Sequence, residues 1–254
     1  HRAVREVEEN ELSEYETSMI LARLDKLDLG PAQIDIGILA AAFMFDDHGQ
    51  NIDEFVNDQV KKGIGNHTPV LKKPQDVVLF GFGRIGRLIT RLILEDTGAG
   101  ETFSLKAVVV RQSKSEDLFK RAELMRRDSV HGPFKGTIRV DEKSNTLVMN
   151  GNPVKFIYAN NPDELDYSKH NIDKAILIDN TGVYRDKKGL SKHLKSKGVS
   201  KVLLTAPTKG ELKNIVYGVN HKDISDKDKI LGAASCTTNA IVPLLKALAE
   251  EYGI

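Results

Sequence analysis

The pattern of hydrophobic and polar positions changes character near residue 75. Before it, apolar residues recur at helical spacing, which predicts three helices: a loosely amphipathic one between Val4 and Leu27, a second over 32–45 and a third over 52–60. The second is apolar nearly all round, so we expect it to be buried. A stretch rich in glycine and proline, 63–75, reads as a linker.

After residue 75, short apolar runs alternate with helical patterns. The runs are typical of strands, and they cover 76–80, 103–110, 137–140, 146–149, 154–158, 174–178 and 201–204. Turns are expected around Ser144-Asn145 and at Asn150-Gly151. This alternation predicts an α/β fold with a doubly wound parallel sheet and right-handed crossovers.

The first strand leads into three glycines. Gly81, Gly83 and Gly86 stand between the run 76–80 and a helical pattern over 84–93. In such a G-x-G-x-x-G segment the glycines allow a tight turn, close approach of a diphosphate and close helix–strand packing. The diphosphate then lies at the helix N-terminus. A purely structural glycine turn is the alternative.

The chain has one cysteine, Cys236, at the start of a helical pattern that reaches Tyr252. Ser235 precedes it as a candidate N-cap. Unpaired backbone N–H groups and the helix dipole favour an anion there, so the thiol is expected to lose its proton readily and act as a nucleophile. An inert, buried cysteine is the alternative.

Several motifs together resemble one enzyme family. They are ASCTTN around Cys236, GFGRIGR at 81–87, RDSVHG at 127–132, DNTGVY at 179–184, LTAP at 204–207 and GVNH at 218–221. In their order along the chain they are similar to the glyceraldehyde-3-phosphate dehydrogenases, over about residues 76–254 and the first half or so of a complete member. The layout resembles bacterial members with a long N-terminal extension.

The resemblance implies three parts. Residues 1–75 would be a helical extension and linker, 76–235 an NAD(P)-binding Rossmann-type domain, and 236–254 the start of a catalytic domain truncated after its first helix. Both ends of the chain read as cuts. The family's base histidine and phosphate-binding arginine would then lie beyond Ile254, and the chain alone would lack full activity.

The implied reaction is oxidation of glyceraldehyde 3-phosphate to 1,3-bisphosphoglycerate, a step of glycolysis and gluconeogenesis, through a thioester on Cys236. Hydride passes to NAD or NADP, inorganic phosphate is the second substrate, and no metal is implied. Ser235 and Thr237 would contact substrate phosphate. Cofactor contacts would come from Gly81, Gly83, Arg84, Ile85, Gly86, Thr181, Gly182 and Thr205. The alternatives are erythrose-4-phosphate dehydrogenase and a non-catalytic dinucleotide-binding scaffold protein.

One position departs from the family. Where an acidic residue usually binds the adenosine ribose at the end of the second strand, this chain has Arg111, followed by Gln112, Ser113, Lys114 and Ser115. A carboxylate would repel the 2′-phosphate of NADP, whereas arginine can pair with it. We therefore expect NADP to be accepted, alone or alongside NAD. A solvated arginine with NAD held by other contacts is the alternative.

The amino-acid composition limits which kinds of binding partner and compartment to expect. The 254 residues include 37 Lys and Arg against 36 Asp and Glu, so no charge excess points to nucleic acid or a membrane surface. A single cysteine fits a reducing, cytoplasmic compartment. The resemblance implies a homotetramer.

Overall fold

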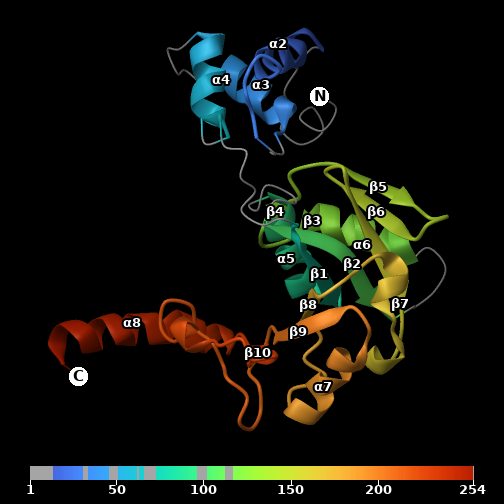
Figure 1. Ribbon diagram of the computed structural model, residues 1–254, viewed down its shortest axis with the longest axis vertical. Helices are drawn as coiled ribbons and strands as arrows, with labels where there is room; N and C mark the ends of the chain where they lie inside the picture. The colour runs from blue at the N-terminus through green and yellow to red at the C-terminus, as the bar shows by residue number, and fades with distance from the viewer. Residues whose placement is uncertain are drawn as a thin grey trace. The chain divides into compact units, whose positions relative to one another are not determined.

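A computed structural model of the protein describes residues 14–30, 34–45, 51–61, 63–65, 73–95, 102–111 and 117–253 (Figure 1). The chain divides into two compact units. One comprises His1–Pro74, Arg91–Ser104 and Leu118–Pro153, and the other Gln75–Thr90, Leu105–Asp117 and Val154–Ile254. The predicted domain boundaries at 75 and 235 stay a prediction.

Three helices of the first unit pack on one another: α2 (Glu14–Leu24), α3 (Ile36–Phe45) and α4 (Ile52–Val60). Their shared core consists of Ile20, Leu24, Ala40, Ala41, Phe55 and Val56. Asn51 caps α4 by accepting from the N–H groups of Asp53 and Glu54. The three helices predicted before residue 75 are therefore present, although residues 1–13, which include the predicted start of the first helix, and residues 66–72 of the linker lie outside the described residues.

The expectation that the second helix is buried all round is wrong. Within α3, Ala40 and Ala41 are buried, but Ile38 is 51% and Met44 46% exposed. The reason is that α2 and α4 are its packing neighbours in the described helical cluster, and two short helices cover only part of its circumference.

The rest of the first unit holds α6 (Asp117–Arg126) and two small hairpins, β3–β4 (Arg127–Asp128, Gly132–Pro133) and β5–β6 (Ile138–Asp141, Thr146–Met149). The buried Arg91 donates to the carbonyls of Gly132 (2.9 Å) and Met125 (2.8 Å). The turns predicted around Asn145 and Asn150 are confirmed, since both residues have a positive φ.

The main sheet has the order β10-β9-β8-β1-β2-β7-β6-β5. Its remaining strands are β1 (Gln75–Phe80), β2 (Phe103–Val110), β7 (Asn152–Tyr158), β8 (Ala175–Asp179), β9 (Val199–Leu204) and β10 (Ile230–Gly232). The pairs β1–β8, β8–β9, β9–β10 and β2–β7 are parallel. The predicted α/β fold with a mostly parallel, doubly wound sheet is thus confirmed.

The strand order reverses between β1 and β8. The chain runs from β1 to its neighbour β2 and onward, then returns to place β8 on the other side of β1. In open α/β sheets, ligands bind beyond the carboxyl ends of the strands at such a switch point. The exits of β1 and β8 are therefore the place to look for a site.

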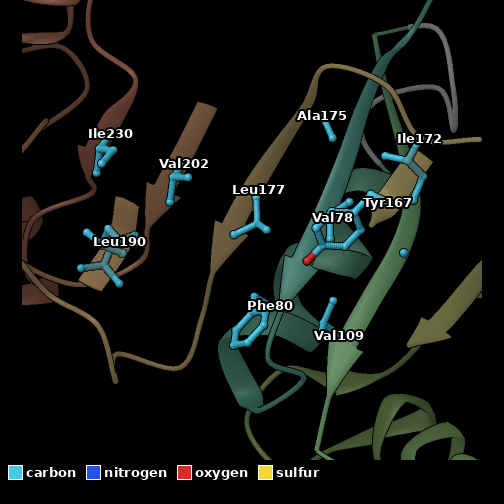
Figure 2. Close-up of a cluster of buried hydrophobic side chains, with 12 residues drawn as sticks. Val78, Phe80, Val109, Tyr167, Ile172, Ala175, Leu177, Leu190, Val202 and Ile230 are labelled. Atoms are coloured by element: carbon cyan, nitrogen blue, oxygen red, sulfur yellow. The ribbon is translucent and has the colours of Figure 1, made fainter. Parts of the chain in front are cut away.

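The core of the second unit lies around these strands (Figure 2). Val78, Leu177 and Val202 come from three neighbouring strands, and Leu190 from α7 (Lys187–Lys195), which packs against β9 and β10. Tyr167, in the short helix η2 (Tyr167–His170), is fully buried. Strand β1 is buried from Asp76 to Phe80, as expected of a parallel strand covered on both faces.

The second unit also contains the short helices η1 (Pro162–Glu164) and η3 (His221–Asp223) and the long helix α8 (Cys236–Tyr252). Across the described ranges, every helix is too short or too polar to span a bilayer.

Candidate functional site

The glycine turn joins β1 to α5 (Arg84–Glu95), and each glycine meets a different constraint. Gly81 has φ +101°, which disfavours any side chain. A Cβ on Gly86 would lie 2.5 Å from the Gly81 carbonyl oxygen, whereas a Cβ on Gly83 would have no atom within 4 Å. The turn therefore requires Gly81, close packing requires Gly86, and Gly83 borders open space.

This open space fits a dinucleotide diphosphate. It adjoins the start of α5, where the first backbone N–H groups of a helix have no partner within the helix. Arg84 and Ile85 are the first two residues of α5, and Ile85 is 47% exposed. A side chain on Gly83 would enter the space that the helix N-terminus offers to an anion.

The exit of β8 meets the glycine turn. A Cβ on Gly81 would lie 2.8 Å from the Thr181 methyl carbon, and the Asn180 N–H donates to the Phe80 carbonyl at 2.8 Å. The Asn180 side-chain amide lies 3.4 Å from the Gly81 carbonyl oxygen. The sequence-predicted residues Gly81 and Thr181 are thus brought together at the switch point.

Asp179 organises this exit, although it was not among the residues predicted from the sequence. Its Oδ1 accepts hydrogen bonds from the Thr181 N–H (2.7 Å) and hydroxyl (2.6 Å). Its backbone carbonyl accepts from the Thr205 N–H (3.0 Å) and hydroxyl (3.1 Å). The predicted cofactor residues Thr181 and Thr205 therefore share one anchor. An aspartate ending an apolar strand, with threonine two residues later, was the available signal.

His193 was missed as well. It lies on α7, is fully buried, and places Nε2 3.1 Å from Asp179 Oδ2. Its ring stands edge-on to Phe80 (centroids 4.8 Å apart) and Tyr184 (5.9 Å). No sequence signal marked it, because α7 is strongly basic and reads as a solvated helix.

An open hollow of about 450 Å³ follows the same loop. It is lined by Gly182, Val183, Tyr184, Arg185, Asp186 and Lys209. Gly182 has φ +62° and its carbonyl accepts from Arg185 Nε at 3.0 Å. The predicted residue Gly182 therefore forms part of a wall with two basic side chains.

Arg111 directly follows β2, the strand next to β1, and it is exposed. It therefore lies at the sheet edge that carries the glycine turn. Gln112, Ser113, Lys114 and Ser115 lie outside the described residues.

Cys236 is the first residue of α8 and is exposed. Ser235 is the N-cap, and its Oγ accepts from the Thr238 N–H at 3.0 Å. Asn239 donates through its amide to the carbonyls of Ala233 (2.7 Å) and Ser235 (2.9 Å). The predicted helix start at the cysteine is confirmed. Thr237 is exposed beside the cysteine.

Cys236 and the glycine turn follow different strands of the sheet. Helix α8 follows β10, an edge strand that stands three places from β1 in the sheet. At the usual strand spacing this is roughly 14 Å. The structure thus gathers Gly81, Gly83, Gly86 and Thr181 at the switch point, and it places Cys236 beyond the outer strand of the same unit.

The comparisons with known proteins agree with this architecture. Residues 75–187 match the family model described as the NAD binding domain of glyceraldehyde 3-phosphate dehydrogenase. A glyceraldehyde-3-phosphate dehydrogenase-like protein of Pseudomonas aeruginosa is 50% identical over 100% of this chain and 56% of its own length. The glyceraldehyde-3-phosphate dehydrogenases of Mycoplasma pneumoniae and Zymomonas mobilis are each 38% identical over 70% of this chain, and over 49% and 50% of their own lengths.

The chain therefore spans about half the length of the curated relatives it matches. The Pseudomonas alignment covers the whole chain, so the similarity includes the helical region before residue 75.

Proposed function

Because residues 75–187 match the family model of the glyceraldehyde 3-phosphate dehydrogenase NAD binding domain, we propose that the protein oxidises glyceraldehyde 3-phosphate to 1,3-bisphosphoglycerate. The activity is proposed for a protein of the relatives' length, because the chain spans only about half of it. The observation that carries the proposal is Cys236, exposed as the first residue of a capped helix in the unit that holds the glycine turn.

In the proposed mechanism, Cys236 Sγ adds as a thiolate to the aldehyde carbon. The Cys236 backbone N–H, at the start of α8, is oriented to donate to the developing oxyanion. Bound NAD supplies the hydride acceptor that turns the adduct into a thioester. Inorganic phosphate then displaces the sulfur, which forms the acyl phosphate and returns the thiolate. Ser235 and Thr237 flank the sulfur and would contact the phosphate groups.

The cofactor would be held by the chain's own backbone and by short side chains. Gly83 leaves room for the diphosphate at the start of α5, where Arg84 and Ile85 contribute their N–H groups. Thr181, Gly182 and Thr205 line the exits of β8 and β9.

The test is an assay of the full-length protein with glyceraldehyde 3-phosphate, NAD and inorganic phosphate, followed by NADH absorbance. We expect Cys236→Ser to lower kcat by at least about a thousandfold, because the hydroxyl is a far poorer nucleophile. Ala240→Ser, one turn further along the same exposed helix face, is the matched control and should retain activity. Undiminished activity in Cys236→Ser would contradict the mechanism.

Two rivals give different results in the same assay. An erythrose-4-phosphate dehydrogenase would show the higher kcat/KM with the four-carbon substrate. A scaffold protein would bind NAD but oxidise neither aldehyde, and the Cys236→Ser substitution would then change nothing.

We also propose that NADP is accepted, supported by Arg111 at the sheet edge beside the glycine turn. Arg111→Asp should lower kcat/KM for NADP about ten- to a hundredfold, since it replaces a charged partner of the 2′-phosphate by a repelling one. The kcat/KM for NAD, measured with the same two proteins, serves as the internal control. Equal efficiency with NADP in both proteins would refute this.

The remaining expectations are a homotetramer in the cytoplasm, with no membrane or nucleic-acid partner. Light scattering on the full-length protein, with and without NAD, measures the oligomeric state.

A further inference from the structure

We propose that Asp179 and His193 are a positioning pair that holds the exit loop of β8 in the shape that receives the cofactor. This inference rests on the proposed dinucleotide site and deepens it. The pair sets the affinity for NAD and leaves the rate of hydride transfer unchanged, because neither residue reaches the reacting atoms.

Asp179 uses both carboxylate oxygens and its carbonyl for this task. Oδ1 takes both hydrogen bonds from Thr181, and the backbone carbonyl takes both from Thr205. Thr181 Oγ1 in turn accepts from the Val183 N–H at 3.2 Å, which extends the chain of bonds into the wall of the hollow. A rotation of this one side chain would release Thr181 and the loop after it.

His193 prevents that rotation. Both side chains are fully buried, and Oδ2 of Asp179 pairs with His193 Nε2 at 3.1 Å. Within the described residues, His193 Nδ1 has no hydrogen-bond partner, so the hydrogen bond to Asp179 is the polar contact that holds the ring. Phe80 and Tyr184 fix the ring plane edge-on from β1 and from the loop.

The pair is coupled to the glycine turn by direct packing. The Thr181 methyl group lies where a Cβ on Gly81 would come within 2.8 Å, so a shift of Thr181 opens or crowds the turn. The His193 ring also packs against Tyr184, which lines the hollow. Both ends of the cofactor-binding loop therefore depend on one buried bond.

The test measures NAD binding to the 254-residue chain by calorimetry, together with the melting temperature of the NAD-free protein. His193→Leu removes the donor and keeps most of the volume, and we expect the Kd for NAD to rise about five- to tenfold. His193→Gln keeps an N–H at a similar reach and should restore affinity to within about twofold. His170→Leu is the matched control, because His170 is exposed on η2.

Asp179→Asn is the milder second variant in case His193→Leu does not fold. It should raise the Kd for NAD as well. The double variant with His193→Leu should lose less NAD-binding free energy than the two single variants lose together, because both substitutions remove the same hydrogen bond. Asp173→Asn, an exposed aspartate just before β8, is its control.

A kinetic readout separates positioning from stability in the full-length protein. Loss of positioning raises the KM for NAD at unchanged kcat, whereas a merely structural defect lowers kcat through the folded fraction and leaves KM unchanged. The inference is overturned if His193→Leu and Asp179→Asn fold and bind NAD like the wild type, or if only kcat falls. If the wild-type chain binds no NAD, the proposed cofactor site itself is wrong.

Discussion

At the scale of single residues, the site depends on where a side chain is absent. Gly86 allows α5 to approach the carbonyl of Gly81, while Gly83 keeps open the space at the helix start. The two glycines stand three residues apart in one motif, yet one serves packing and the other serves the ligand. Substitutions can therefore separate the two tasks.

We expect Gly86→Ala to lower the free energy of unfolding by about 1–2 kcal/mol. Overpacking against backbone costs about 1–3 kcal/mol, and the better helix propensity of alanine offsets up to about 1. Gly83→Ala should change stability by less than about 0.5 kcal/mol but raise the Kd for NAD at least about tenfold, because the methyl group enters the diphosphate space. Urea unfolding and calorimetry measure both. Equal stability losses in the two variants would contradict the assignment.

Asp228 is a residue whose charge supports a loop. Its Oδ2 accepts from Lys213 Nζ, the Ser225 N–H and the Ser225 hydroxyl, each at 2.8 Å. The Lys213 bond and then the two Ser225 bonds lower the pKa of Asp228 to about 2. A depressed carboxyl pKa stabilises the fold above the unfolded pKa and ceases to do so as pH falls through the folded pKa.

Asp228→Asn should therefore be less stable than the wild type at neutral pH. The difference should shrink as the pH falls from about 4 to about 2. Denaturant unfolding at several pH values measures this difference, with the exposed Asp226→Asn as the control. A difference that does not depend on pH would mean that the ionised carboxylate is not what supports the loop.

At the scale of elements, α8 differs in its burial from every strand of the main sheet. It carries an apolar face, yet within the described chain none of its residues is buried. Leu244 is 62% and Leu245 54% exposed, whereas Leu177 of β8 is fully buried. The start of α8 is instead held by the Ser235 cap and the Asn239 bonds. Further along the helix, Lys246 Nζ donates to the Gly218 carbonyl at 2.8 Å.

Replacing Leu244 and Leu245 together by glutamine should change the free energy of unfolding of this chain by less than about 0.5 kcal/mol. Both side chains already face solvent, and glutamine has a similar helix propensity. Leu177→Ala should cost about 2–5 kcal/mol, because it leaves a cavity in the sheet core. A loss above about 1 kcal/mol in the double variant would show that the α8 face is covered.

At the scale of the whole molecule, two of the buried clusters formed by the described residues have no residue in common. One gathers α2, α3 and α4 around Phe55, and the other surrounds Leu177 beneath the cofactor edge of the sheet. A ligand that binds one folded unit stabilises that unit by mass action, by about 2.7 kcal/mol at a concentration of one hundred times Kd.

Phe55→Ala should therefore destabilise the helical cluster by about 3–5 kcal/mol and leave the NAD-linked stabilisation unchanged. Phe55 is 3% exposed and its ring centroid lies 5.3 Å from that of Phe43. Calorimetric melting with and without NAD measures both effects, with Leu177→Ala as the counterpart in the sheet core. If Phe55→Ala abolished the shift caused by NAD, the helical cluster would be part of the cofactor site.

The sequence by itself determined what depends on near neighbours. Hydrophobic periodicity predicted seven strands of the main sheet and the helices α3, α4 and α5, glycine chemistry predicted the turn after β1, and Ser235 predicted the start of α8. These features are set by backbone dihedrals and hydrogen bonds within a few residues, so a local pattern records them. The motifs that contain them also indicated the resemblance to the glyceraldehyde-3-phosphate dehydrogenases.

Tertiary structure decided what depends on strand order. Gly81 meets Thr181, a hundred residues later, only because β8 returns to the side of β1. Asp179 pairs with His193 only because α7 packs beneath β9 and turns its buried face inward. The exposed side of α3 likewise follows from how many helices surround it. Such contacts are selected by the packing of distant segments, and no pattern along a single stretch of chain encodes them.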